Sequence, residues 1–250
     1  MPGADPPPIG PPAGLAVLPV TGVGELRPGD DLAAVLADAL TAPGTGPGLY
    51  DGDVVVVTQK VVSKAEGRLV PLDPSDPGAK TRLVEDESVR VLRRRGELVI
   101  SETRHGFVCA NAGVDLSNVA DGEAALLPVD PDRSARRLRA DLRRRLDVDV
   151  GVVISDTFGR VWRRGVTDVA IGCAGVVAVL DLRGTTDAGG RSLQVTEICL
   201  ADELSAAAEL GMGKDRGVPA AVVRGVPAAW LGDGSVADDV VRRPDEDLFR

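Results

Sequence analysis

The chain has 250 residues, with 29 Lys and Arg against 38 Asp and Glu, so its formal net charge is −9. This acidic balance and the scarcity of aromatic residues argue against a nucleic-acid binder, which would need basic patches or stacking platforms. No apolar run approaches the ~20 residues of a membrane-spanning helix. The three cysteines are too few and too widely spaced for a disulfide framework. We therefore expect a cytoplasmic protein that binds neither nucleic acid nor membranes.

The start of the chain combines a tail with the first elements of a domain. Residues 1–14 are rich in proline and predict a disordered tail, followed by one domain over 15–250. Within the domain, the sequence predicts a strand at 15–20 and a short helix at 31–40. The β-branched run at 53–58 is typical of a strand that is buried on both faces.

The middle of the chain mixes helices with short strands. Residues 79–95 are predicted to form a charged amphipathic helix, and 98–101 and 107–110 to form short strands. Residues 131–146 place leucines four apart, which predicts a helix with one apolar stripe and an arginine-rich outer face.

The last third is predicted to hold strands at 150–155, 194–200 and 220–224, and a helix at 201–210 that is capped by Asp202. Strands and helices alternate without a regular βαβ order, which predicts an α+β fold with mixed sheets, with an irregular α/β fold as the alternative. The sequence contains no GxxxxGK[ST] P-loop and no GxGxxG Rossmann motif, so a bound nucleotide would need other loops.

Two acidic motifs are candidate metal ligands. Asp156 and Thr157 begin the predicted polar turn DTFGR after a buried strand, where open sheets place their ligands. A carboxylate beside a hydroxyl suits Mg²⁺ or Mn²⁺. Asp115 and Asn118 lie three residues apart in a polar loop, and Asp115 could bind a hard cation. The alternative for Asp115 and Asn118 is a turn, and the alternative for Asp156 and Thr157 is a helix cap or a turn after the strand.

Lysines and glycines supply candidate phosphate contacts. Lys60 and Lys64 follow the strand at 53–58 and could hold phosphate, or could lie along the surface. Glycine-containing loops at 20–31 and 211–219 offer backbone N–H groups to phosphates. His105 is the single histidine, which excludes a histidine-rich zinc site, and we expect it to be structural.

Several of these segments carry a family resemblance. The chain contains DGDVVVVTQKVVSKAEGR, ANAGVDLSN, and ISDTFGR with RRGVTDVAIG, in that order. Together they closely resemble the coenzyme F420:L-glutamate ligase family, and the similarity extends over residues 15–249. The chain looks most like the ligase part of a bifunctional form, without the flavin-binding nitroreductase-like domain that follows it there.

The resemblance implies a γ-glutamyl ligase fold in two lobes and a homodimer. It implies an enzyme that uses GTP as co-substrate and adds L-glutamate through γ-linkages to the deazaflavin precursor F420-0. Mg²⁺ or Mn²⁺ would be the cofactor, with K⁺ as a further candidate. The resemblance provides no residue that we would name as general base.

By motif match, Asp115 and Asp156 would be metal ligands, with Thr157 on a second metal. The residues expected to contact GTP are Val23, Gly24, Glu25, Leu26, Gln59, Lys60, Lys64, Asn118, Met212, Gly213, Lys214, Asp215, Arg216, Gly217 and Val218.

Two positions depart from the family pattern. Gln59 and Lys60 stand where a Ser-Thr or Ser-Lys pair is common, so an amide replaces a hydroxyl. Lys214 stands where some members carry a carboxylate metal ligand. A charged lysine cannot coordinate a cation, so Lys214 could instead approach a phosphate.

Two other functions stay open from the sequence. The first is a metal-dependent GTP phosphohydrolase, which would release phosphate from GTP without glutamate or deazaflavin. The second is a nucleotide- or metal-binding module without catalysis, which would bind GTP tightly and form no amide.

Overall fold

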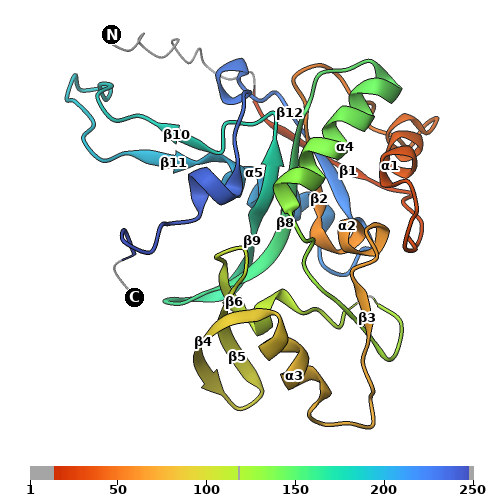
Figure 1. Cartoon of the computed structure of the whole chain (residues 1–250). Coiled ribbons are helices and arrows are strands. Elements are labelled where there is room, and N and C mark those ends of the chain that lie inside the picture. Colours follow the sequence, from red (N-terminus) through yellow and green to blue (C-terminus); the bar gives the residue numbers. More distant parts are fainter. Residues whose placement is uncertain (1–13, 118, 248–250) are drawn as a thin grey trace.

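A mixed five-stranded sheet forms the centre of the protein (Figure 1). The computed structural model describes residues 14–117 and 119–247. In spatial order the strands are β1 (Ala16–Val20), β12 (Ala220–Arg224), β2 (Val54–Thr58), β8 (Gly151–Arg160) and β9 (Arg163–Ala174). Only β2 and β8 pair in parallel within this sheet, and the other neighbours are antiparallel. The expected α+β class with mixed sheets is therefore confirmed.

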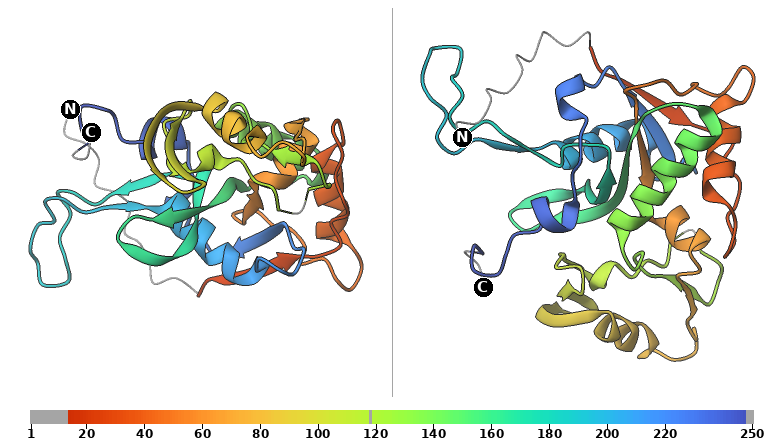
Figure 2. Two further views of the ribbon diagram at one scale, coloured as in Figure 1. Left: turned by 90° about the horizontal axis from the view of Figure 1, so that it is seen from below. Right: turned by 45° about the horizontal axis from the view of Figure 1, so that its top comes forward.

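Burial explains why the central strands form. The four valines of β2 before Thr58 are completely buried, because helices cover both faces of the sheet. On one face lies α4 (Pro131–Leu146), with α1 (Leu32–Thr41) beside it, and on the other lies α5 (Leu200–Met212) (Figures 1 and 2). The β-branched run therefore behaves as the sequence predicted.

Helix α4 shows how local sequence sets its own ends. Asp130 is its N-cap, and the Asp130 side chain accepts a hydrogen bond of 2.9 Å from the Arg133 backbone N–H. Pro131 occupies the first turn, where its missing N–H costs nothing. Leu138 and Leu142 are buried on one stripe, as predicted. Both predicted ends of this helix are confirmed.

A smaller region lies at one end of the main sheet (Figure 1). It contains a three-stranded sheet of β4 (Ser88–Arg95), β5 (Leu98–Thr103) and β6 (Val108–Ala110), with α3 (Ala79–Asp86) packed against it. This region has its own hydrophobic cluster, separate from the main core.

Two small sheets of two antiparallel strands each complete the fold. Strand β3 (Leu69–Pro71) pairs with β7 (Glu123–Ala125) on the way into and out of the smaller region. Strand β10 (Val179–Asp181) pairs with β11 (Glu197–Cys199), and the loop between them projects away from the body (Figures 1 and 2).

One predicted helix is wrong. Residues 79–95 do not form a single helix, because α3 ends at Asp86 and β4 begins at Ser88. The second half pairs with β5 along the edge of its sheet. Charged side chains on an exposed edge strand hide the two-residue alternation, and tertiary pairing outweighs local helix propensity.

Three shorter predictions also need correction. The turn predicted at DTFGR is wrong, because β8 continues to Arg160 and forms a long hairpin with β9. Asp202 does not cap α5, because the N-cap of this helix is Cys199. The Asp202 carboxylate instead accepts a hydrogen bond of 2.9 Å from the Ala170 N–H of β9. The strand predicted at 194–200 covers only β11, because Leu200 already begins α5.

The structure also shows a helix that the sequence did not predict, α2 (Gln59–Ala65), directly after β2. Of the helices in the described ranges, none combines the length and apolarity needed to cross a bilayer.

Candidate active site

The topology brings four segments that carry predicted site residues to one edge of the main sheet. Strands β2 and β8 are parallel and end together, because Thr58 pairs with Ser155. Strand β12 runs antiparallel to β2, so its start, with the loop 213–219 before it, lies at the same edge. Strand β1 runs antiparallel to β12 and ends there too, followed by the loop that carries Glu25. Segments far apart in sequence therefore converge.

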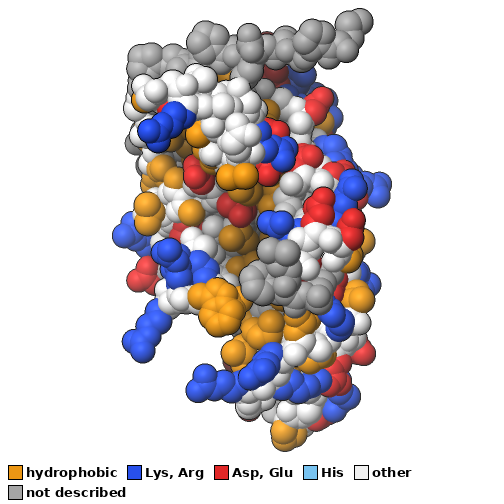
Figure 3. Space-filling view, turned by 90° about the vertical axis from the view of Figure 1, so that its left-hand side faces the viewer, with side chains coloured by type: hydrophobic (Ala, Val, Ile, Leu, Met, Phe, Trp, Pro, Cys, Tyr) orange, Lys and Arg blue, Asp and Glu red, His pale blue; other side chains and the backbone are white. Residues whose placement is uncertain are grey.

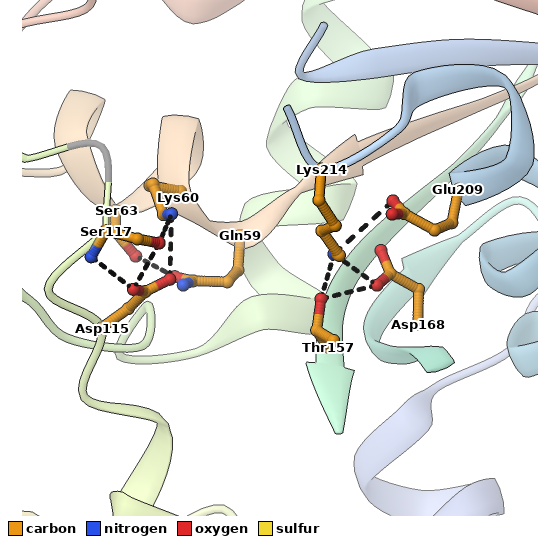
Figure 4. Close-up of polar contacts among 9 residues, drawn as sticks. All are labelled: Gln59, Lys60, Ser63, Asp115, Ser117, Thr157, Asp168, Glu209 and Lys214. Carbon is orange, nitrogen blue, oxygen red and sulfur yellow. Dashed lines mark hydrogen bonds and ion pairs between the residues drawn. The ribbon is translucent and has the colours of Figure 1, made fainter. Parts of the chain in front are cut away.

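A cavity of about 830 Å³ lies at this edge, between the main sheet and β6. Its polar and charged lining residues are Glu25, Thr58, Gln59, Lys60, Lys64, Asn111, Asp115, Ser117, Ser155, Asp156, Thr157, Asp168, Glu209 and Lys214. Figure 4 shows two groups of these side chains facing each other across the cavity.

The first group joins α2 to the loop that follows β6. The Lys60 Nζ atom lies 2.9 Å from Asp115 Oδ2 and donates to Ser117 Oγ at 2.8 Å (Figure 4). The Ser117 backbone N–H donates to Asp115 Oδ1 at 2.7 Å. Burial alone would raise the pKa of Asp115, but these hydrogen bonds outweigh it and hold the pKa below its ordinary value. Asp115 is therefore a fixed anion.

Helix α2 also presents Lys64 and Gln59 at this end of the sheet. Lys60 and Lys64 are four residues apart and share a helix face. Lys64 is only 5% exposed, and its ammonium pairs with Glu25 from the loop after β1. The Gln59 amide oxygen accepts a hydrogen bond of 2.9 Å from Ser63 Oγ, and both residues are buried. The amide that stands in place of the family's serine hydroxyl therefore has a hydrogen-bond partner inside the protein.

The second group is built on the β8–β9 hairpin and the C-terminal end of α5. Thr157 and Asp168 are direct cross-strand partners, and the Thr157 hydroxyl donates to Asp168 Oδ1 at 2.7 Å. Lys214 Nζ lies 2.8 Å from Asp168 Oδ1 and 3.5 Å from Glu209 Oε2, and it also contacts Thr157 Oγ1 (Figure 4). Burial opposes the charge of Lys214, but Asp168 and Glu209 raise its pKa.

Asp156 directly precedes Thr157 on β8 and has no such counterion. Among the described residues, no lysine or arginine forms an ion pair with its carboxylate. Burial raises the pKa of Asp156 to about 7, and the nearby carboxylates of Asp115 and Asp168 add to the increase. A cation bound here would relieve that repulsion.

Most of the sequence-predicted residues meet in this cavity. Those that line it are Val23, Gly24, Glu25, Gln59, Lys60, Lys64, Asp115, Asp156, Thr157, Gly213, Lys214, Gly217 and Val218. Leu26 and Met212 do not line it, because their side chains are buried. Asp215 and Arg216 belong to the same loop but are not part of the lining. Asn118 lies outside the described residues.

The sequence reasoning missed Asp168 and Glu209. The sequence offered a signal for Asp168, because the segment RRGVTDVAIG has the pattern of a β-strand. The structure pairs this strand with DTFGR, which places Asp168 opposite Thr157. Glu209 had a weaker signal, its position just before the glycine-containing loop at 211–219. Neither residue belongs to an acidic motif on its own.

The donor set fits one divalent cation. Asp115 and Asp156 offer hard oxygen atoms and lie close enough to repel each other electrostatically. In the part of the chain that the structure describes, no three His, Cys, Asp or Glu residues are arranged to hold a metal by themselves. This matches Mg²⁺, which proteins usually bind through one or two carboxylates together with phosphate oxygens of the substrate.

The donor set does not fit a second cation on Thr157. The Thr157 hydroxyl already donates to Asp168 and accepts from Lys214, and the Lys214 ammonium fills the space beside it. A metal ion there would have to displace a positive charge that Asp168 holds.

Comparison with known proteins now assigns the chain. The sequence profile of the family described as F420-0:Gamma-glutamyl ligase matches residues 22–225. The chain belongs to this ligase family. Members named coenzyme F420:L-glutamate ligase are similar over nearly the whole length. The Methanopyrus kandleri protein is 44% identical over 94% of this chain and 98% of its own, and the Methanothermobacter thermautotrophicus protein 41% over 95% and 99%.

Proposed function

We propose that this chain joins L-glutamate to the deazaflavin precursor F420-0 through a γ-linked amide bond, at the expense of GTP. The family and the names of its relatives support glutamate ligation onto this coenzyme. The observation that carries the proposal is the meeting of Lys60, Lys64, Asp115 and Asp156 in one cavity at the ends of β2 and β8.

The chemistry explains why a nucleotide is needed. A carboxylate does not form an amide in water unaided, because oxide is a poor leaving group. The terminal carboxylate of F420-0 attacks the γ-phosphorus of GTP, and GDP leaves, which gives an acyl phosphate. The amine of glutamate then attacks the carbonyl carbon, phosphate leaves, and the nitrogen releases a proton. Phosphoryl transfer of this kind depends on positioning and charge neutralisation.

The charges of the cavity match that requirement. Among the described lining residues, three lysines face five carboxylates, so the cavity is acidic overall. A triphosphate would be repelled unless a divalent cation accompanied it. Asp115 and Asp156 would hold Mg²⁺ or Mn²⁺, which would supply neutralisation of the phosphate charge. Lys60 and Lys64 would offset the remaining phosphate charge from helix α2.

Backbone groups would complete the nucleotide site. The loop at 213–219 enters the cavity with Gly213 and Gly217, both at positive φ, where glycine is favoured. Such a loop lets backbone N–H groups approach phosphates closely. The loop after β1, with Val23 and Gly24, faces the cavity beside it.

A product-mass assay tests the proposal. The protein is incubated with F420-0, L-glutamate, GTP and Mn²⁺, and the deazaflavin is analysed by mass spectrometry. We expect products heavier by whole glutamyl units, with GDP and phosphate released in equal amounts. Replacing GTP by ATP should abolish or strongly reduce product. Phosphate release that is independent of F420-0 and glutamate, with no mass change, would instead indicate a phosphohydrolase.

A further inference from the structure

The ammonium group of Lys214 lies in an oxygen cage that resembles a cation site. Thr157 from β8, Asp168 from β9 and Glu209 from α5 each direct an oxygen atom at Nζ (Figure 4). Three separate elements converge on this one atom. Lys214 itself extends from the loop that follows α5, and its side chain is half exposed, so it closes the cage from the solvent side.

Hydrogen-bond counting shows how fully the ammonium is used. A lysine ammonium has three N–H donors and no acceptor. Lys214 Nζ donates two hydrogen bonds, to Thr157 Oγ1 and to Asp168 Oδ1, and it forms an ion pair with Glu209 Oε2 at 3.5 Å. Its positive charge is therefore already shared by three oxygen atoms of this chain, two of them from carboxylates.

Asp168 explains why a positive charge must be present here. Its side chain is only 1% exposed, and it accepts hydrogen bonds from the hydroxyls of Ser155 at 3.1 Å and Thr157 at 2.7 Å. Hydroxyls alone do not neutralise a buried carboxylate, and an unpaired buried charge is strongly destabilising. Among the described residues, Lys214 is the ion-pair partner of Asp168.

We propose that the Lys214 ammonium is a built-in cation that takes the place of a second divalent ion beside Thr157, Asp168 and Glu209. The chain then holds one divalent ion, at Asp115 and Asp156, and supplies the other positive charge covalently. Any role of this positive charge in catalysis rests on the proposed GTP-dependent ligation. The position of the Lys214 ammonium in the cage does not rest on that proposal, because it follows from contacts within this chain.

Counting bound Mn²⁺ tests this inference without nucleotide, glutamate or deazaflavin. The wild type, Lys214→Gln and Lys214→Glu are titrated with MnCl₂, and bound ions are counted by electron paramagnetic resonance and isothermal titration calorimetry. Each Lys214 variant should bind one Mn²⁺ ion more per chain than the wild type, and Lys214→Glu should bind it more tightly. Equal counts and affinities in all three proteins would overturn the proposal.

Two further variants locate the extra ion. Lys214→Gln combined with Asp168→Asn should return to the wild-type count, because the cage then loses its buried carboxylate. If the extra ion persists, it lies elsewhere and the inference is wrong. Lys80→Gln, on α3 outside the cavity lining, is the matched control and should leave the count unchanged. Circular dichroism confirms folding of each variant.

The result is distinguishable from failure of the proposed function. If ligation requires no GTP but the Lys214 variants gain a Mn²⁺ ion, the cage assignment stands and the nucleotide proposal falls. If ligation depends on GTP and no variant gains an ion, only the cage assignment falls.

Discussion

Asp156 shows how a single residue can be costly to the fold and useful to a site. Its carboxylate is buried and lies near the carboxylates of Asp115 and Asp168, while the lysines of the cavity pair with other acids. The elevated pKa means that the folded protein holds a proton on Asp156 that the unfolded chain releases. Burial of this charge is therefore an unfavourable contribution to folding that a bound cation would offset.

Asp156→Asn should abolish ligation and at the same time stabilise the protein. Between about pH 4, the ordinary range of an aspartate, and the folded pKa of about 7, the unfolded chain binds fewer protons than the folded one. Wild-type stability due to this group therefore falls as pH rises through that window, and then levels off. In EDTA, which removes divalent cations, the free energy of unfolding of Asp156→Asn should exceed that of the wild type by on the order of 2 kcal/mol at pH 8. At pH 4 the two proteins should differ little.

Thermal and chemical unfolding at both pH values measure this difference. Asp121→Asn, an exposed aspartate outside the cavity lining, is the control and should change stability little at either pH. A variant of Asp156 that is less stable than the wild type at pH 8, or that retains normal ligation, would contradict the assignment.

Lys64→Ala should raise the KM for GTP without unfolding the protein. Lys64 is buried, but its partner Glu25 is largely exposed, so water can solvate the glutamate once the lysine is gone. Loss of a positive charge beside the phosphates should raise KM about tenfold, equivalent to about 1.4 kcal/mol of binding. Steady-state kinetics measure this, with Lys80→Ala as the control. An unchanged KM would return Lys64 to a structural role.

At the scale of elements, the N-terminus of α4 fixes both the sheet and the C-terminal segment. Asp132 is buried in the first turn of α4 and accepts hydrogen bonds from the backbone N–H groups of Cys173 on β9 and of Val236 and Ala237. Gly172 permits this contact, because a Cβ atom there would lie 2.3 Å from the Pro131 carbonyl carbon. One carboxylate thus joins three segments distant in sequence.

Asp132→Ala should destabilise the fold, because it leaves three backbone donors without their acceptor. We expect a loss of about 3 kcal/mol in the free energy of unfolding. Urea denaturation measures the change, and hydrogen exchange should show faster exchange at 236–237 than elsewhere in the main core. Asp132→Asn, which keeps a side-chain acceptor, should fall between the alanine variant and the wild type. An unchanged urea midpoint for Asp132→Ala would rule out this role.

At the scale of the whole molecule, exposed apolar side chains gather at the tip of the β8–β9 hairpin. Val161 and Trp162 are the most prominent, and Trp162 is 84% exposed. Figure 3 shows the face on the left of Figure 1, where Lys and Arg side chains project around a seam of hydrophobic side chains. Large exposed apolar groups ringed by charge are typical of protein–protein contacts. They support the homodimer that we expect for this chain.

Sedimentation equilibrium tests the dimer. We expect a mass of twice the 25.9 kDa chain at micromolar concentration. Trp162→Asp should shift the equilibrium toward the monomer, because it places a charge on the exposed apolar tip. Arg144→Gln, at an exposed position of α4, changes the net charge by the same single unit without altering the hairpin and serves as control. A wild type that sediments as a monomer at all concentrations would exclude this proposal.

The sequence by itself determined the elements whose signals are local. The valine run of β2, the cap, proline and leucine stripe of α4, and strand β12 follow from short-range patterns, and the structure confirms them. The acidic motifs at Asp115 and Asp156 were also visible as candidate ligands. These features need no knowledge of distant contacts, because burial periodicity and capping act within a few residues.

Only the tertiary structure decided how those pieces make a site. Sheet pairing converted the second half of a predicted helix into β4 and a predicted turn into the β8–β9 hairpin. That hairpin places Asp168 opposite Thr157, and strand order brings Lys214 to both. Such contacts join residues 11 to 57 positions apart. Their energies depend on burial and on which charges meet, and neither is encoded in any local stretch of sequence.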